Sequence, residues 1–192
     1  MSDAGLPRRL AAAVPSYARL AWWGLASPQL AEREPLVVHQ AAVIGPEGLL
    51  LAVRSELRGW ELPGGSALPG EGGEFAAQRE VMEETGVSVR VERCVSEYVR
   101  TGFRPHTARI YRCVPIGGHP RPSPETARVA WFDPTALPTT LFPWFRGPIA
   151  DALDPPSASS GLPVRRERQG APAILAGMAI DLRMRLSGDE AI

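Results

Sequence analysis

The chain has 192 residues, of which 44% are apolar and 22% charged, as in ordinary globular domains. Its 21 basic residues balance its 21 acidic residues, which argues against general affinity for nucleic-acid polymers. No apolar run approaches the roughly 20 residues that a membrane-spanning helix needs, so no membrane residence is expected. Length and composition therefore predict one folded domain with extensions.

The cysteines and the N-terminus predict a cytoplasmic location. Cys94 and Cys113 have no CxxC partner and no His cluster around them, so we expect buried thiols rather than a disulfide framework or a zinc site. Arg8 and Arg9 precede an apolar run that resembles a short signal peptide. Pro15 interrupts that run and the apolar pattern continues beyond it, which favours a retained segment over a cleaved one.

The first 153 residues predict strands and helices in alternation. Residues 1–35 carry apolar side chains at helical spacing and predict an N-terminal helical extension. Helices are also predicted between Phe75 and Thr85 and over 143–153. Apolar and alternating runs predict strands at 36–44, 49–54, 87–100, 108–116 and 127–133. This order favours an α+β fold, with a sheet flanked by helices.

The composition changes after residue 153. Pro, Ser and Gly are frequent in residues 154–172, which predicts a flexible linker. Residues 173–192 predict an amphipathic helix, which packs either on the domain or on a partner chain and leaves room for a homodimer. Its apolar stripe consists of Leu175, Met178, Leu182 and Leu186.

Three glutamates on the predicted central helix predict a metal site. Glu80, Glu83 and Glu84 are spaced i, i+3 and i+4, so they share one helix face although like charges repel there. Clustered carboxylates are the oxygen ligands that a hard divalent cation such as Mg²⁺ prefers. The alternative to a metal site is an acidic helix face that is simply exposed to solvent. Arg79, four residues before Glu83, can hold a carboxylate in orientation.

The glycine-rich loop before this helix strengthens the metal hypothesis. Gly64 and Gly65 follow a presumed strand that begins at Trp60. Glycine lets the backbone come close to a ligand, so a carbonyl oxygen here can add to the carboxylate ligands. Alone, two glycines and a proline indicate only a turn.

Loop and helix together read G-x5-E-x7-R-E-V-x-E-E-x-G-V. This pattern resembles the signature of the Nudix hydrolases, and every fixed position matches. The upstream WELPGG and the downstream ARVAWFD are also similar to this family, so the resemblance covers residues 36–153. The matched positions are Gly65, Glu71, Arg79, Glu80, Val81, Glu83, Glu84, Gly86 and Val87.

The resemblance implies a fold and an activity. The fold is an α/β/α sandwich with a mixed β-sheet between helices. The activity is metal-dependent hydrolysis of the pyrophosphate bond of a nucleoside diphosphate linked to another moiety: a nucleotide sugar, a dinucleotide, ADP-ribose or a nucleoside triphosphate. The cofactor is Mg²⁺ or Mn²⁺, and the partner is a small phosphorylated substrate.

The resemblance also implies roles for individual residues. Glu80 and Glu84 are metal ligands with Glu83 close by, and the carbonyl of Gly64, next to Gly65, is a backbone ligand. Arg79 orients the glutamates. Glu71 supports the site through a salt bridge or a metal-bound water. The resemblance leaves the identity of the general base open. The first candidate is Glu125, which precedes a late strand; its alternative is an ordinary surface residue. The other candidates are Glu97 and Glu80.

Two further questions stay open in the sequence. Arg54 and Trp60 are candidates to bind the phosphates and the base of a substrate, although either can be purely structural. The alternative function is a catalytically silent Nudix-fold module that senses a ligand or binds a partner. An isomerase-like activity would need an acid/base pair facing the metal, and Cys94 and Cys113 carry no supporting motif.

Overall fold

The computed structural model describes residues 11, 14–15, 17–18, 36–102, 105–155 and 161–187. Most of the expected N-terminal helical extension lies outside these residues, although the five described within it are helical. The helices are α3 (Gly73–Thr85), η1 (Pro143–Phe145), α4 (Arg146–Leu153) and α5 (Ala171–Leu186). The strands are β1 (Leu36–Gly45), β2 (Gly48–Arg54), β3 (Trp60–Glu61), β4 (Gly64–Ser66), β5 (Val87–Gly102), β6 (His106–Gly118), β7 (Thr126–Phe132) and β8 (Val164–Gln169).

The strands form a mixed sheet in the order β3-β2-β1-β6-β5-β8, with β4 paired to β1 and β7 paired to β2. β1 runs parallel to β6 and β5 runs parallel to β8, whereas the other pairs are antiparallel. In the β1–β4 pair, Gln40 lies opposite Gly64 and His39 opposite Gly65. The glycine loop is therefore anchored to the middle of the sheet.

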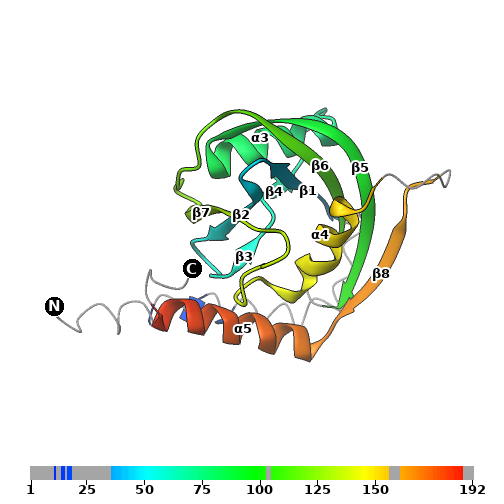
Figure 1. The fold of residues 1–192 in the computed structure, drawn as a ribbon. Coiled ribbons are helices and arrows are strands. Elements are labelled where there is room, and N and C mark those ends of the chain that lie inside the picture. Colours follow the sequence, from blue (N-terminus) through cyan, green and yellow to red (C-terminus); the bar gives the residue numbers. More distant parts are fainter. Residues whose placement is uncertain are drawn as a thin grey trace.

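Helices cover both faces of this sheet (Figure 1). Side chains of β1 alternate between the two faces, as the period of two in a strand requires. Ala41 and Val43 pack in one core with Val81 of α3. Ala42 belongs to the other core, which includes Phe145 and Ile149 from the η1–α4 segment. This confirms the expected α/β/α arrangement with a mixed sheet.

The expected flexible linker over 154–172 is wrong for residues 164–169. These residues form β8, which pairs parallel to β5 and extends the sheet at its edge. Arg165 bonds Asp151 of α4, and Glu167 bonds the buried Arg100 of β5. The sequence VRRERQ shows no apolar alternation because most of these side chains are exposed. Main-chain pairing and ion pairs hold this strand, and neither leaves a hydropathy signal.

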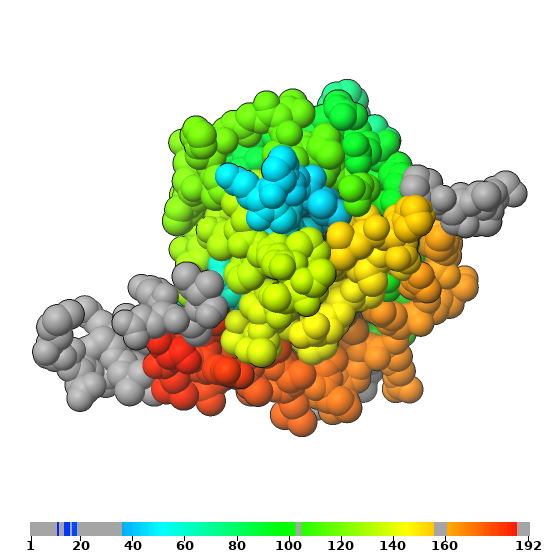
Figure 2. All heavy atoms as spheres, viewed as in Figure 1, coloured from blue at the N-terminus to red at the C-terminus, as the bar shows by residue number. Residues whose placement is uncertain are grey.

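The C-terminal helix forms, but the expected leucine stripe does not face the domain. Leu175, Leu182 and Leu186 are 65%, 40% and 55% exposed, whereas Met184 and Asp181 are 3% and 0% exposed. The docked face is therefore partly polar, which the apolar stripe could not predict. In Figure 2 the orange-to-red atoms of α5 form a band along the lower edge of the molecule.

Asp181 explains which face of α5 docks. Its carboxylate accepts hydrogen bonds from the backbone N–H of Arg58 and from Nε of Arg185, each at 2.7 Å. Arg185 also donates to the carbonyl of Glu56 at 2.9 Å. The helix thus holds the loop between β2 and β3, and the hydrogen bonds of the buried Asp181–Arg185 ion pair to the loop backbone offset part of the cost of burying its charges.

Both cysteines are free; Cys113 is buried, as expected, whereas Cys94 is only half-buried. Within the described ranges, no helix has both the length and the apolar character needed to cross a bilayer. The homodimer stays a prediction.

Candidate active site

The helix α3 places the glutamates on one face and apolar residues on the other. It begins after Gly72, whose lack of a side chain leaves no side-chain cap. It ends at Gly86, which adopts a left-handed conformation with φ 75° and donates to the carbonyl of Met82. Ala77 and Val81 are fully buried against the sheet. Glu84 lies in the last turn and is only 4% exposed.

Gly64 and Gly65 leave no room for a side chain. A Cβ on Gly64 would lie 2.2 Å from the backbone oxygen of His39. A Cβ on Gly65 would lie 2.4 Å from the carboxylate carbon of Glu80. Glycine here therefore allows the loop to lie flat against β1 and allows the Glu80 carboxylate to reach the loop.

These two glycines predict different effects of the same substitution. Gly65→Ala needs only a shift of the Glu80 carboxylate, which is the mobile end of a side chain, so we expect a small change in melting temperature. We expect its activity to fall on the order of 10²-fold, because small misplacements of a reacting group have effects of that size. Gly64→Ala meets rigid backbone, and thermal unfolding should show a clear loss of stability. Equal loss of stability in both variants would contradict this account.

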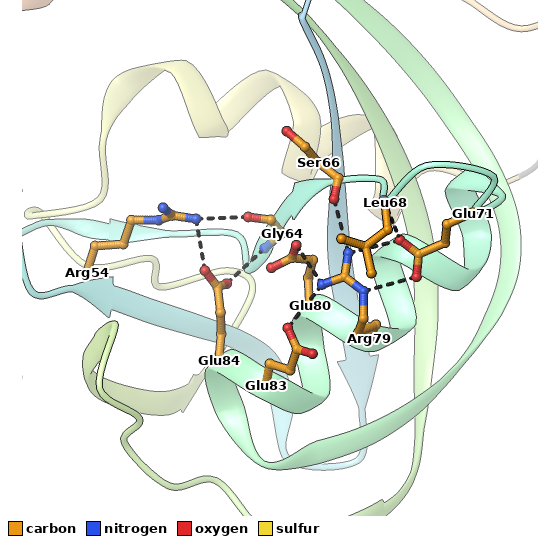
Figure 3. Close-up of polar contacts among 9 residues, drawn as sticks. All are labelled: Arg54, Gly64, Ser66, Leu68, Glu71, Arg79, Glu80, Glu83 and Glu84. Carbon is orange, nitrogen blue, oxygen red and sulfur yellow. Dashed lines mark hydrogen bonds and ion pairs between the residues drawn. The ribbon is translucent and has the colours of Figure 1, made fainter.

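Arg79 is the centre of a hydrogen-bond network that holds the loop to the helix (Figure 3). Its guanidinium donates to both carboxylate oxygens of Glu71 at 3.0 Å, and to the carbonyl of Ser66 at 3.0 Å. It also donates to Glu80 at 2.9 Å and to Glu83 at 3.0 Å. One planar cation therefore fixes the loop and two of the three clustered glutamates.

Arg54 organises the other half of the site (Figure 3). Its Nη2 donates to the carbonyl oxygen of Gly64 at 2.9 Å and to Oε1 of Glu84 at 2.8 Å. Its Nε donates to Oε1 of Glu61 at 2.8 Å. The second oxygen of Glu84 accepts from the backbone N–H of Gly64 at 2.9 Å. Glu84 and the glycine loop are thus joined directly and through Arg54.

The donor set suits a hard divalent cation. Within the described parts of the chain, no three His, Cys, Asp or Glu side chains already converge as a metal site. The carbonyl of Gly64 and Oε1 of Glu84 nevertheless converge on one positive atom, Nη2 of Arg54. Glu80 lies against the same loop. Carboxylate and carbonyl oxygens are ligands that Mg²⁺ and Mn²⁺ accept.

The environment of Glu84 disfavours its charged form. Burial raises the pKa of Glu84 to about 7, and the nearby Glu61 and Glu80 carboxylates add to this increase. Arg54 and the N–H of Gly64 lower the pKa but do not offset the burial. A carboxylate that is buried in this way is stabilised by a cation that binds it.

This raised pKa predicts how the metal-free protein responds to pH. Between the usual carboxyl pKa of 4.5 and about 7, the folded state binds more protons at Glu84 than the unfolded state does. Stability from this group is therefore present below pH 4.5 and is lost as pH rises through 7. We expect Glu84→Gln to match the wild type at pH 4 and to exceed its free energy of unfolding at pH 8 by up to roughly 3 kcal/mol. Urea unfolding at both pH values, with a chelator present, measures the difference, and equal stabilities at pH 8 would contradict it.

The structure also places the remaining candidates. Glu125 is exposed in the loop before β7, and its charge raises the pKa of Arg54 slightly, after the larger effect of Glu61. Glu97 is on β5 and forms an ion pair with Arg109. Trp60 is fully buried and packs edge-on against Phe132, which favours its structural alternative over contact with a substrate base.

Glu61 is the site residue that the sequence did not reveal. It follows Trp60 directly, lies opposite Ala52 in the β2–β3 pair and binds Arg54 across that hairpin. Its position in the segment WELPGG could have indicated a role in the site, because that segment is similar to the family pattern.

Comparison with known proteins agrees with this geometry. Residues 35–153 match the family model described as the NUDIX domain. The chain belongs to the Nudix hydrolase family. The enzyme class is accordingly a Nudix pyrophosphohydrolase.

Relatives and solved structures agree with the assignment to the Nudix family. A MutT-like protein of Streptomyces ambofaciens is 37% identical over 135 residues, which cover 68% of this chain and 86% of that protein. A Bacillus subtilis protein, provisionally named 8-oxo-dGTP diphosphatase, is 34% identical over 95 residues, or 50% of this chain and 64% of that protein. The structure of an ADP-ribose pyrophosphatase from Streptococcus suis aligns with a TM-score of 0.57 at 24% sequence identity. The alignment covers 70% of this chain and 100% of that protein's chain, so the two share a fold.

Proposed function

We propose that this Nudix hydrolase cleaves the pyrophosphate bond of a nucleoside diphosphate linked to another moiety, with Mg²⁺ or Mn²⁺ as cofactor. One observation carries the proposal: the carbonyl of Gly64 and the carboxylate of Glu84 converge on one cationic atom, with Glu80 against the same loop. Residues that hold a positive charge at one point between two oxygens can hold a metal ion there.

Gly64, Glu80 and Glu84 would hold the metal, with Glu83 next to them. When bound, a divalent cation would polarise a phosphate group, favour ionisation of the attacking water and neutralise charge on the leaving phosphate. Glu71 fixes Arg79 through two parallel hydrogen bonds, and Arg79 in turn fixes Glu80 and Glu83. Arg79 and Glu71 therefore act as positioning residues, because they orient the glutamates without a role in bond cleavage.

The hydrolysis itself needs one proton acceptor. The water oxygen forms a bond to one phosphorus while the bond from that phosphorus to the bridging oxygen breaks, so the bridging oxygen leaves with the other phosphate, and the water gives up a proton to a base. We propose Glu125 for this base, because it is exposed and lies near Arg54 at the edge of the site. Glu80 is the second candidate. Glu97, which forms an ion pair with Arg109 on the neighbouring strand β6, ranks third.

The substrate is small and phosphorylated, and the names of the relatives suggest which compounds to test. One relative is named for 8-oxo-dGTP and one solved structure for ADP-ribose. Since Trp60 is buried, recognition of the base must use other side chains. The free cysteines support a reducing location, and we propose the cytoplasm.

The test is a substrate panel of nucleoside triphosphates, 8-oxo-dGTP, nucleotide sugars, dinucleotides and ADP-ribose, each with Mg²⁺ or Mn²⁺. Products are separated by chromatography, so that cleavage within the diphosphate is distinguished from release of terminal phosphate. We expect turnover of one class, with cleavage at a P–O–P bridge. Specific binding of a nucleotide without turnover of any compound would instead support the ligand-sensing alternative.

A further inference from the structure

Arg54 binds the two oxygens that the proposed metal site needs. Its Nη2 lies 2.9 Å from the carbonyl oxygen of Gly64 and 2.8 Å from Oε1 of Glu84 (Figure 3). A guanidinium keeps its charge at all accessible pH values, so it cannot leave by losing a proton. The second oxygen of Glu84 is occupied as well, because it accepts from the N–H of Gly64.

A metal ion and Nη2 of Arg54 would compete for the same oxygens. Both are positively charged, and a cation bound between the Gly64 carbonyl and Oε1 of Glu84 would stand at the position that the guanidinium nitrogen holds. Like charges at contact distance repel strongly where water is scarce. Metal binding at this point therefore requires Nη2 to move.

The surroundings of Arg54 permit this movement. Its side chain is 40% exposed, so it has a path towards solvent, whereas Glu84 is 4% exposed and stays in place. The Nε of Arg54 binds Glu61, and the Glu61 carboxylate is 16% exposed. Glu61 can therefore hold one end of the guanidinium while the other end leaves the glycine loop.

We propose that Arg54 is a tethered cation that holds Gly64 and Glu84 in their binding geometry in the metal-free protein and is displaced when a metal ion binds. This inference rests on the proposed metal site. The buried Glu84 carboxylate is unstable without a positive partner, and Arg54 supplies one until the metal arrives. The cost is a lower apparent metal affinity, since only the fraction of molecules with Arg54 displaced can bind.

The direct test follows the side chain of Arg54 by NMR. Protein labelled with ¹⁵N-arginine and ¹⁵N-glycine is titrated with diamagnetic Mg²⁺, so that the side chain of Arg54 and the amide of Gly64 are both observed. Arg54→Gln assigns the Arg54 Nε and Nη signals, and the amide of Gly64 reports binding. We expect the Nη protons of Arg54 to be protected from exchange without Mg²⁺ and to lose this protection at saturation.

Unchanged Arg54 signals while the Gly64 amide shifts would overturn the inference and leave the metal site intact. No shift of Gly64 at any Mg²⁺ concentration would overturn both.

A second measurement compares metal affinities by calorimetry. Mn²⁺ should bind Arg54→Gln roughly tenfold more tightly than the wild type, if the docked state of Arg54 is favoured by about 1.4 kcal/mol. The matched control is Arg128→Gln, on the neighbouring strand opposite Val53, whose guanidinium packs over the Trp60 ring. It removes an equal charge nearby, so it reports the general electrostatic effect. An equal gain in both variants, or none in Arg54→Gln, would contradict displacement.

Discussion

Glu84→Gln is expected to lower the rate of hydrolysis on the order of 10³-fold without unfolding the protein. The change replaces one oxygen that can hold a cation with an amide nitrogen, at the point where Gly64 and Glu84 converge. Loss of a single preorganised electrostatic contact has effects of this size on catalysis. Stability should not fall at pH 8, because the substitution removes a buried charge that the environment disfavours.

The control for this prediction is Glu74→Gln, the same change in the exposed first turn of α3. Its activity and its melting temperature should both stay near the wild-type values. Activity is measured by initial rates at saturating Mg²⁺, and stability by thermal unfolding with a chelator present. If Glu84→Gln unfolds at a much lower temperature, or keeps wild-type rates, Glu84 is structural and the account of the site fails.

Arg79→Lys is expected to lower kcat by roughly 10- to 100-fold and to lower the melting temperature as well. Lysine keeps the positive charge but cannot make the two parallel bonds to Glu71 while also reaching Glu80, Glu83 and the carbonyl of Ser66. Substitution of a residue that orients metal ligands typically lowers metal affinity or activity by this factor.

The matched control is Arg90→Lys, since Arg90 lies on β5 with 62% of its side chain exposed. This variant should be indistinguishable from the wild type. Because Arg79 is proposed to position ligands rather than to contact the substrate, Arg79→Lys should change kcat more than KM. A variant with normal kcat and raised KM would instead place Arg79 against the substrate.

The local parts of this site could be predicted from the sequence. The helix α3 and the common face of Glu80, Glu83 and Glu84 depend on spacings of three and four residues. The sheet strands on either side follow from apolar runs, and the structure has them within a few residues of the expected bounds. These features depend on neighbours in the chain, which is the information that a single sequence contains.

The long-range polar contacts could not be predicted. Arg54 and Glu84 are 30 residues apart, and Arg58 and Asp181 are 123 apart. Nothing in either segment indicates the other, because a charged residue in a sequence does not specify its partner. The same reason explains the strand β8, whose ion pairs and main-chain pairing leave no apolar pattern, and the docked face of α5.

The central claim is that a metal-dependent pyrophosphohydrolase site lies between the glycine loop and α3. The most direct measurement is ³¹P NMR of the best substrate from the panel, before and after removal of divalent cations by chelation. The account predicts that the phosphorus signals of one P–O–P bridge disappear, and the signals of two terminal phosphate groups replace them, only when Mg²⁺ or Mn²⁺ is restored. Equal turnover in the chelated protein, or intact diphosphate after metal is restored, would contradict it.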